Sequence, residues 1–498
     1  MDIDQIPILK SLMEYRDEEV ISFHMPGHKK GRAQKKAGLD LLAGDLLSMD
    51  TTEVPGIDNL HSPEAAILSA QRLAAAAFGA DESFLLVNGT TCGIYTMIMA
   101  ATEPGDKIII PRNCHRSVYG ALILGRLTPV YIEPELDAEL GIALGIKPET
   151  LEYTLEKHRD AKAVVITNPT YYGTCSDLKK IAEIVHERNA LLLVDEAHGS
   201  HFSFSERLPM SALQAGADMA AQSIHKTMPA MTQGSMLHVR YGRVNIERVR
   251  LFLQLTQTTS PSHILLASLD TARYIMQVKG RELLSEIIDW SNRARKEINS
   301  IPGLYCLSAD RIGRHGVADI DPTRITVNFG RLGMDGKKAE AILRKSFKLQ
   351  VEMSDLYNIV AISTVGNTHA DYEQLVRALG KLALSGERGE AAGTAPAFQK
   401  TPELCIMPWE AVYCEKEQVA SGDSIGRVCG EMIIPYPPGI PVLMPGERIT
   451  AEAYGYLQVC VEKGIKISGA LDTKLERICV IKDGQGAIRD GQLRSHGI

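Results

Sequence analysis

The stretches Leu191-Leu-Leu-Val-Asp-Glu-Ala-His198 and Met219-Ala-Ala-Gln-Ser-Ile-His-Lys226 decide how this chain folds. Each begins with a short apolar run, which is typical of a buried strand. An ionisable residue follows each run: Asp195 in the first stretch and Lys226 thirty-one residues later in the second. The sequence therefore predicts a carboxylate and an amine at the ends of two nearby strands.

This pairing suits pyridoxal 5′-phosphate (PLP). A lysine amine can form a Schiff base with the cofactor's aldehyde, and an aspartate can keep its pyridine nitrogen protonated. A buried carboxylate needs a cationic partner, which a pyridinium supplies. The alternative is that Asp195 and Lys226 form an ordinary charge pair on the surface.

A phosphate site is expected where the strand Phe84–Val87 gives way to Asn88-Gly-Thr-Thr-Cys-Gly93 and then to a helical run, Ile94–Ala101. Free N–H groups at a helix N-terminus attract a phosphate dianion, and the hydroxyls of Thr90 and Thr91 can add hydrogen bonds. Gly89, Thr90 and Thr91 are therefore candidate cofactor ligands. An ordinary helix cap is the alternative interpretation.

A third candidate site residue is His115, which follows the apolar run Ile108–Ile110. An imidazole at this position could stack on a pyridine ring. A histidine just past a strand can equally be a loop residue without a chemical role.

Residues 80–240 alternate short apolar strands with amphipathic helices, such as the one expected over Ser176–Asn189. This alternation is typical of an α/β fold with a mostly parallel sheet, in which ligands bind beyond the carboxyl ends of the strands. All the candidate residues named so far follow an expected strand.

The rest of the chain suggests further domains, since 498 residues are too many for a domain with a single hydrophobic core. A long helix is expected over Leu269–Ser300, followed by mixed strands and helices to about residue 384. Residues 385–400 are rich in Gly, Ala and Glu and read as a linker. The expected division is an N-terminal segment (1–30), a large cofactor-binding domain (31–268), a small α+β domain (269–384), the linker (385–400) and a C-terminal α+β domain (401–498). A helix is expected in the C-terminal domain near Thr450–Lys463.

Composition excludes several classes of protein. The net charge is −7, from 54 basic and 61 acidic residues without a basic block, so no nucleic-acid partner is expected. The nine cysteines form no CxxC pair, which argues against a zinc site, and no metal is expected. No run reaches the ~18 apolar residues of a membrane helix, and residues 1–20 do not resemble a signal peptide. We expect a cytoplasmic protein without membrane contact.

Several motifs together resemble the Orn/Lys/Arg decarboxylases, which are PLP enzymes with the aspartate-aminotransferase fold (PLP fold type I). The resemblance covers nearly the whole chain in order, and its motifs start at these positions: His24-Met-Pro-Gly-His28, Asn168-Pro-Thr-Tyr-Tyr-Gly173, Asp195-Glu-Ala-His198, Ala221-Gln-Ser-Ile-His-Lys226, Thr258-Thr-Ser-Pro261, Glu352-Met-Ser-Asp355 and Pro435-Tyr-Pro-Pro-Gly-Ile-Pro441.

The resemblance implies roles for further residues. Ser223 and His225 would contact the phosphate, and His225 could also help deliver a proton. His198 would reach the ring oxygen or the departing carboxylate. Ser260 would reach the phosphate of a neighbouring subunit, so we expect a homodimer or a dimer of dimers with shared sites.

The expected substrate is a basic amino acid, whose cationic tail requires a facing carboxylate. Glu352 and Asp355 are the candidates for this contact, with Tyr436 and Glu447 as weaker ones. The compact chain resembles the arginine decarboxylases of Gram-positive bacteria, which make agmatine for polyamine biosynthesis. Arginine is therefore the favoured substrate, and lysine and ornithine remain open.

Two readings of another class also remain. An aminotransferase would share the fold and the lysine but normally holds the α-carboxylate with an arginine, and the stretch Asn358–Ser363 contains none. A non-catalytic regulator would be expected to lack Lys226 or Asp195, and both are present.

Overall fold

The computed structural model of the protein describes residues 2–19, 21–22, 24–26, 29–36, 44–384, 401–436 and 439–483. The expected linker, 385–400, lies outside these residues, as does the last part of the expected C-terminal domain. The domain bounds stay a prediction.

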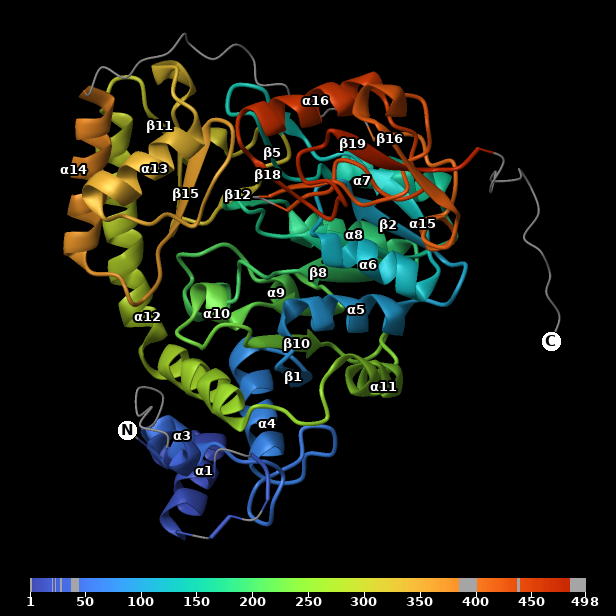
Figure 1. Ribbon diagram of the computed structural model, residues 1–498. Coiled ribbons are helices and arrows are strands. Elements are labelled where there is room, and N and C mark those ends of the chain that lie inside the picture. Colours follow the sequence, from blue (N-terminus) through green and yellow to red (C-terminus); the bar gives the residue numbers. More distant parts are fainter. Residues whose placement is uncertain are drawn as a thin grey trace, which may run out of the picture.

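A seven-stranded sheet forms the centre of the molecule (Figure 1). Its strands, in spatial order, are β1 (Glu82–Leu86), β10 (Ser235–Val239), β9 (Met219–Gln222), β8 (Leu191–Asp195), β6 (Ala161–Thr167), β2 (Lys107–Pro111) and β3 (Thr128–Ile132). Strand β10 alone runs in the direction opposite to the other strands. The mostly parallel sheet predicted from the apolar runs is therefore confirmed.

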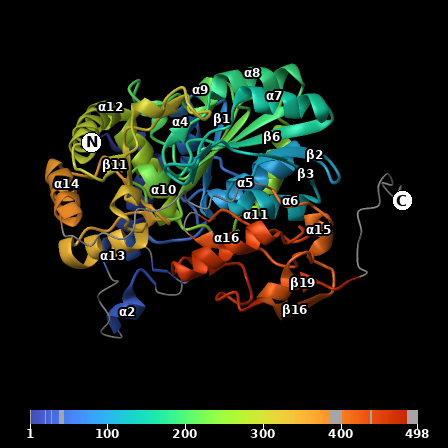
Figure 2. The ribbon, with the colours of Figure 1, turned by 90° about the horizontal axis from the view of Figure 1, so that it is seen from above.

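Both faces of this sheet are covered by helices, because the strands are apolar on both sides. Ile108 and Ile110 pack into one core cluster with α5 (Gly89–Ala101), α6 (Arg116–Gly125) and α11 (Ile246–Thr256). Ile109 points the other way, into a cluster with α7 (Pro148–Lys157), α8 (Leu178–Glu187) and α9 (Ala212–Ala215). Figure 2 shows these two helical layers on opposite sides of the strands. The helix expected over 176–189 is confirmed as α8, with slightly closer bounds.

A second, antiparallel sheet follows the long helix α12. Its order is β11 (Tyr305–Cys306), β13 (Arg324–Asn328), β15 (Asn358–Ile362) and β14 (Met353–Ser354), and α13 (Gly336–Phe347) and α14 (His369–Leu384) pack against it. Helix α12 spans His263–Asn299, so it begins before the expected Leu269. The reason is an N-cap: the Ser262 hydroxyl accepts a hydrogen bond from the N–H of Leu265.

Residues 401–483 form a compact unit beside the large sheet, where α15 (Pro408–Ala411) contacts α6. It contains two antiparallel strand pairs, β16 (Lys416–Ala420) with β19 (Arg477–Ile481), and β17 (Ile434–Tyr436) with β18 (Lys466–Ser468). Its main helix, α16 (Ala451–Glu462), begins after the N-cap Thr450 and confirms the expected helix there.

The remaining elements are short or lie near the N-terminus. Helix α1 packs on α12 and α4. The bounds are α1 (Pro7–Asp17), α2 (Arg32–Lys36), α3 (Asp45–Met49), α4 (Ala66–Phe78), α10 (Ile224–Thr227), β4 (Leu136–Asp137), β5 (Ile142–Ala143), β7 (Thr174–Cys175) and β12 (Asp319–Ile320).

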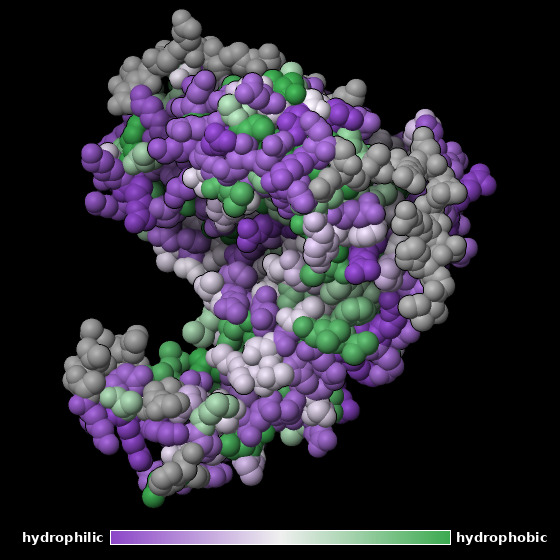
Figure 3. Space-filling view, turned by 45° about the vertical axis from the view of Figure 1, so that its right-hand side comes forward, coloured by the Kyte–Doolittle hydropathy of each residue, from purple (hydrophilic) through white to green (hydrophobic). Residues whose placement is uncertain are grey.

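Hydrophilic residues dominate the face of the molecule drawn in Figure 3, which is hollowed between its upper and lower parts. Within the described part of the chain, no helix has both the length and the apolar character needed to cross a bilayer.

Candidate active site

A cavity of about 350 Å³ lies past the carboxyl ends of the central strands, where a parallel sheet presents its ligand site. All the candidate residues except Ser260, Asp355 and the weaker candidate Glu447 line it: Gly89, Thr90, Thr91, His115, Asp195, His198, Ser223, His225, Lys226, Glu352 and Tyr436. Residues from several separate stretches of sequence thus meet in one place.

Lys226 sits on the short helix α10, immediately after β9. Its Nζ is 3.1 Å from Nε2 of His198 and lies 5.7 Å from the centre of the Tyr171 ring. Burial lowers the pKa of Lys226, against the opposing attraction of Asp195. The amine is therefore easier to deprotonate than a lysine in water, as a nucleophilic lysine requires.

Asp195 is the last residue of β8 and is only 4% exposed. Its Oδ1 accepts a hydrogen bond of 3.2 Å from the N–H of Ala197. Burial raises the pKa of Asp195, and nearby Lys226 opposes this rise. A cation bound beside the carboxylate would therefore stabilise its charged form.

A cluster of donors surrounds the start of α5. This helix begins at Gly89 without a side-chain cap, so its first N–H groups are left for another acceptor. The hydroxyl of Thr90 bonds to those of Ser223 and Ser235, which joins the helix start to the segment before Lys226. Gly89 has φ +73°, a conformation that favours glycine at this turn. The arrangement can bind a phosphate.

In His225 and His115, which both line the cavity, the partner of Nδ1 shows whether this atom donates or accepts a hydrogen bond. Nδ1 of His225 must donate to the carbonyl of Gly234, 2.8 Å away, since a carbonyl only accepts. His115 caps α6, and its Nδ1 accepts from the N–H of Ser117 at 3.3 Å. Burial, and then the charge of Lys226, lower the pKa of His115 to about 4. Its ring is therefore neutral near pH 7 and can lie against a cationic heterocycle.

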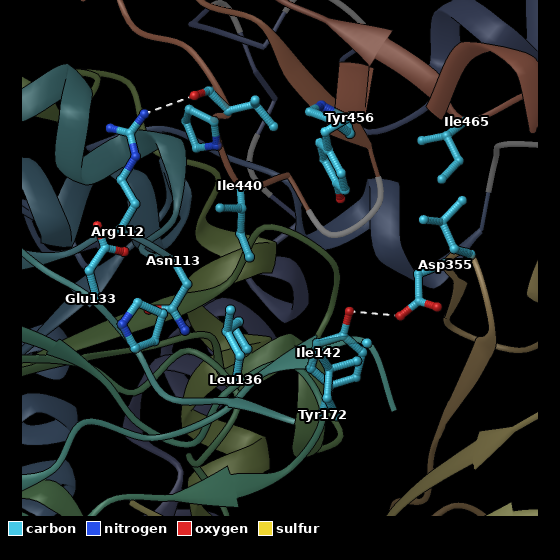
Figure 4. Close-up of a pocket in the computed structure, with 17 residues that line it drawn as sticks. Arg112, Asn113, Glu133, Leu136, Ile142, Tyr172, Asp355, Ile440, Tyr456 and Ile465 are labelled. Carbon is cyan, nitrogen blue, oxygen red and sulfur yellow. Dashed lines mark hydrogen bonds between the residues drawn. The ribbon is translucent and has the colours of Figure 1, made fainter. Parts of the chain in front are cut away.

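The two candidate tail-binding acids lie in different cavities. Glu352 lines the main cavity and is exposed. Asp355 lines an adjoining cavity of about 120 Å³, where Tyr172 donates to its Oδ2 at 2.8 Å (Figure 4). Its Oδ1 accepts from the N–H groups of Tyr357 and Asn358, so this carboxylate holds the turn between β14 and β15.

The weaker candidates also separate. Tyr436 lines the main cavity and is 52% exposed. Glu447 does not line it: the side chain is 0% exposed and forms a bidentate ion pair with Arg112, at 2.7 and 2.8 Å. Arg112 also donates to the carbonyl of Val442, which attaches the 401–483 unit to the end of β2. The structure thus contradicts a tail-binding role for Glu447.

Ser260 lies outside the cavity, in the exposed connection between α11 and α12. The N–H of Thr258 in the same connection donates to Asn88 Oδ1, at the start of α5. Ser260 therefore does not complete the site of its own chain.

Arg324 is a residue of the site that the sequence did not reveal. It is the first residue of β13, is 1% exposed, and donates from Nη2 to Nδ1 of His198 at 3.2 Å. Strand β13 pairs with β15, which lies within the Asn358–Ser363 stretch that contains no arginine. The absence of an arginine from 358–363 is therefore no argument against carboxylate binding by an arginine.

Comparisons with known proteins point to the same family over nearly the whole chain. Residues 6–371 match the Orn/Lys/Arg decarboxylase major domain and residues 392–474 the C-terminal domain of the same enzymes. The chain is 42% identical to an arginine decarboxylase of Halalkalibacterium halodurans, over 98% of this chain and 99% of that protein. It is 40% identical to one of Bacillus subtilis, over 97% and 99%.

Solved structures show the same fold. A lysine decarboxylase of Francisella novicida superposes with a TM-score of 0.82 at 23% identity, over 96% of this chain and 81% of that one. An alanine–glyoxylate aminotransferase of Nostoc superposes with a TM-score of 0.53 at 18% identity, over 64% and 86%. The second likeness stops short of the full chain, as expected for an enzyme that shares only part of the architecture.

Proposed function

Because this chain belongs to the Orn/Lys/Arg decarboxylase family, we propose that it is a PLP-dependent decarboxylase that converts L-arginine to agmatine and CO2. The observation that carries the proposal is the convergence of Lys226, Asp195 and the open start of α5 in one cavity. The arginine decarboxylases at 40% and 42% identity over nearly the full chain support arginine as the substrate.

The residues of the cavity fit PLP. An amine with a lowered pKa, a buried carboxylate and an uncapped helix start are the groups that its aldehyde, ring nitrogen and phosphate require. In addition, Oγ1 of Thr167 is buried in the cavity wall without a hydrogen-bond partner among the described residues. When bound, PLP supplies an electron sink for the pair of electrons left at Cα by the departing CO2.

The chain's own residues would divide the remaining work. Lys226 would hold the cofactor through its aldehyde. Asp195 would keep the ring nitrogen protonated, and Thr90 and Ser223 would bind the phosphate. His115 would lie against the ring, while His198 and His225 would position or deliver protons. For CO2 rather than a proton to leave Cα, the cavity walls would have to hold the bond between Cα and the substrate carboxylate perpendicular to the pyridine ring.

The direct test is an assay of amine and CO2 formation from arginine, lysine and ornithine. Of the three amino acids, arginine should be decarboxylated with the highest kcat/KM and should yield agmatine. A clear preference for lysine or ornithine would leave the proposed decarboxylation standing but contradict arginine as the substrate.

An aminotransferase is the second candidate, and Arg324 is the observation that favours it. Adding a 2-oxo acid as amino acceptor and a measurement of keto-acid formation to this assay separates the two activities, since transamination yields a keto acid without releasing CO2. Keto-acid formation as the main activity would overturn the decarboxylase proposal.

The substrate tail is expected to face Glu352. Glu352→Gln should lower kcat/KM for arginine about ten- to a hundredfold, since a charge-assisted hydrogen bond is lost. The spectrum of the bound cofactor should not change. Steady-state kinetics on the three basic amino acids measure this effect.

Asp355→Asn is the matched control for that variant. Its carboxylate holds a turn and bonds to Tyr172, so we expect a lower melting temperature with a smaller change in kcat/KM of the folded enzyme. A larger selective loss in Asp355→Asn than in Glu352→Gln would assign the tail to the adjoining cavity instead.

We also propose that the enzyme is a homodimer or a dimer of dimers in which Ser260 serves the partner's site. Mixing inactive Lys226→Ala with inactive Ser260→Asp should restore about a quarter of wild-type activity, because half of the randomly formed dimers are hybrids with one intact site. Activity after refolding the mixture measures this.

The control is a mixture of Lys226→Ala with Asp195→Asn. These two residues line one cavity of one chain, so no hybrid contains an intact site. Hybrids verified by mass that remain inactive in the first mixture would contradict a shared site.

A further inference from the structure

Three side chains from different parts of the fold form a continuous line of hydrogen bonds. Arg324 on β13 contacts Nδ1 of His198 at 3.2 Å, and Nε2 of the same ring contacts Nζ of Lys226 at 3.1 Å. His198 is 3% exposed and its ring centre lies 4.3 Å from that of Tyr171. The imidazole therefore connects the small sheet to the reactive lysine.

The direction of each hydrogen bond in this line follows from the first. A guanidinium has only N–H donors, so Arg324 donates and Nδ1 of His198 accepts. A neutral imidazole whose Nδ1 accepts carries its single proton on Nε2. That Nε2–H then donates to Nζ of Lys226, and only an unprotonated amine has a lone pair to accept it.

We propose that Arg324 is a positioning residue that fixes His198 as the Nε2–H tautomer and thereby holds Lys226 as a neutral amine before the cofactor binds. The role of that amine toward PLP rests on the proposed function. The inference itself concerns the hydrogen bonds of the chain alone.

The surroundings of Lys226 agree with a neutral amine. Burial lowers the pKa of Lys226 and holds that of His198 well below its usual value, and the charge of Arg324 lowers both. Burial likewise raises the pKa of Asp195, so the carboxyl beside the amine is also driven toward its neutral form. The titratable or charged groups around the amine, besides His198, are Asp195, Arg324, Glu352, Tyr171, His115 and His225.

The backbone leaves room for Arg324 to reach the histidine. Gly173 has φ +92°, and a Cβ there would meet Cβ and Cγ of Arg324 at 2.6 and 2.7 Å. Nε and Nη1 of Arg324 have no hydrogen-bond partner among the described residues. Its bond to His198 is consequently the contact that orders the end of this side chain.

The first test reads the tautomer directly. In the full-length chain freed of cofactor and labelled with ¹⁵N-histidine, NMR spectra should show His198 as the Nε2–H form at pH 7, with His198→Gln identifying its signals. Arg324→Met should lose this form, whereas Arg324→Lys, which retains a donor, should keep it. An Nδ1–H tautomer or an imidazolium in the wild type would overturn the proposal.

The second test follows the amine. Trace acetylation of the cofactor-free chain, resolved by mass spectrometry, gives the rate at the Lys226 peptide as a function of pH. In Arg324→Met the pKa of Lys226 should rise, and each unit of that rise lowers the neutral fraction about tenfold below the pKa. The labelling rate at pH 7 should therefore fall in Arg324→Met, and Arg324→Lys should restore it.

Exposed Lys180 serves as the internal control in the same digest, and its profile should not move. Superimposable Lys226 profiles for the wild type and Arg324→Met would refute the proposal. Neither measurement needs substrate or turnover, so its failure is distinct from a failure of the decarboxylase assignment. The wild-type tautomer remains decisive even if Arg324→Met does not fold.

Discussion

Lys226→Ala is expected to abolish decarboxylation. The expected fall in kcat is roughly 10³–10⁶-fold, which is the loss typical of enzymes from which a covalently acting residue is removed. The reason is that no other lysine lines the cavity described here. Borohydride treatment of the PLP-loaded wild type should attach the cofactor to the peptide that carries Lys226. Peptide mass spectrometry and the assay of CO2 release measure the two effects.

Lys180→Ala is the matched control for this variant. Lys180 is exposed on α8, where it pairs with Glu183, so its removal should leave kcat and labelling unchanged. Both variants should keep the melting transition of the wild type within a few degrees. A borohydride label on a different lysine, or substantial turnover in Lys226→Ala, would mean that the cofactor is bound elsewhere.

Asp195→Asn is expected to lower kcat on the order of 10²–10³-fold, as the loss of a preorganised electrostatic group does. The amide has nearly the same shape but cannot carry the negative charge that keeps the ring nitrogen protonated. Cofactor binding should persist, because the phosphate and aldehyde contacts come from other residues. Titration with PLP and single-turnover kinetics separate binding from chemistry.

Glu196→Gln is the control, since Glu196 is the next residue and is equally buried. Its carboxyl bonds to the N–H of Ala212 and to Gln222 and does not line the cavity. Burial raises the pKa of Glu196 to about 8, and glutamine keeps the shape of the side chain and one oxygen that can accept these hydrogen bonds, so Glu196→Gln should retain turnover. Near-normal turnover in Asp195→Asn would refute the proposed role of that residue.

The large sheet and most of the cavity could be predicted because their signals are local. The strands around Ile108, Leu192 and Ala220 are apolar on both faces, and a parallel sheet collects the residues that follow such strands at one edge. Asp195 and Lys226 therefore meet as expected. Their positions follow from the ends of β8 and β9.

The contributions of the small sheet and of the 401–483 unit could not be predicted in the same way. Arg324 and His198 are 126 residues apart, and their contact depends on how the antiparallel sheet docks on the parallel one. No local pattern marks that docking. Asp355 resembles a free acid in sequence, and only the turn geometry shows that Tyr357 and Asn358 already use its Oδ1.

The ion pair between Arg112 and Glu447 restricts how this protein can change over evolutionary time. Both side chains are almost completely buried, so removing one partner leaves an uncompensated buried charge. Such a loss lowers the free energy of unfolding by about 3–5 kcal/mol. Neither position can drift alone, whereas replacing both with apolar residues of similar volume would be tolerated. A C-terminal unit transplanted from a relative would therefore be accepted only if it brings an acid to position 447.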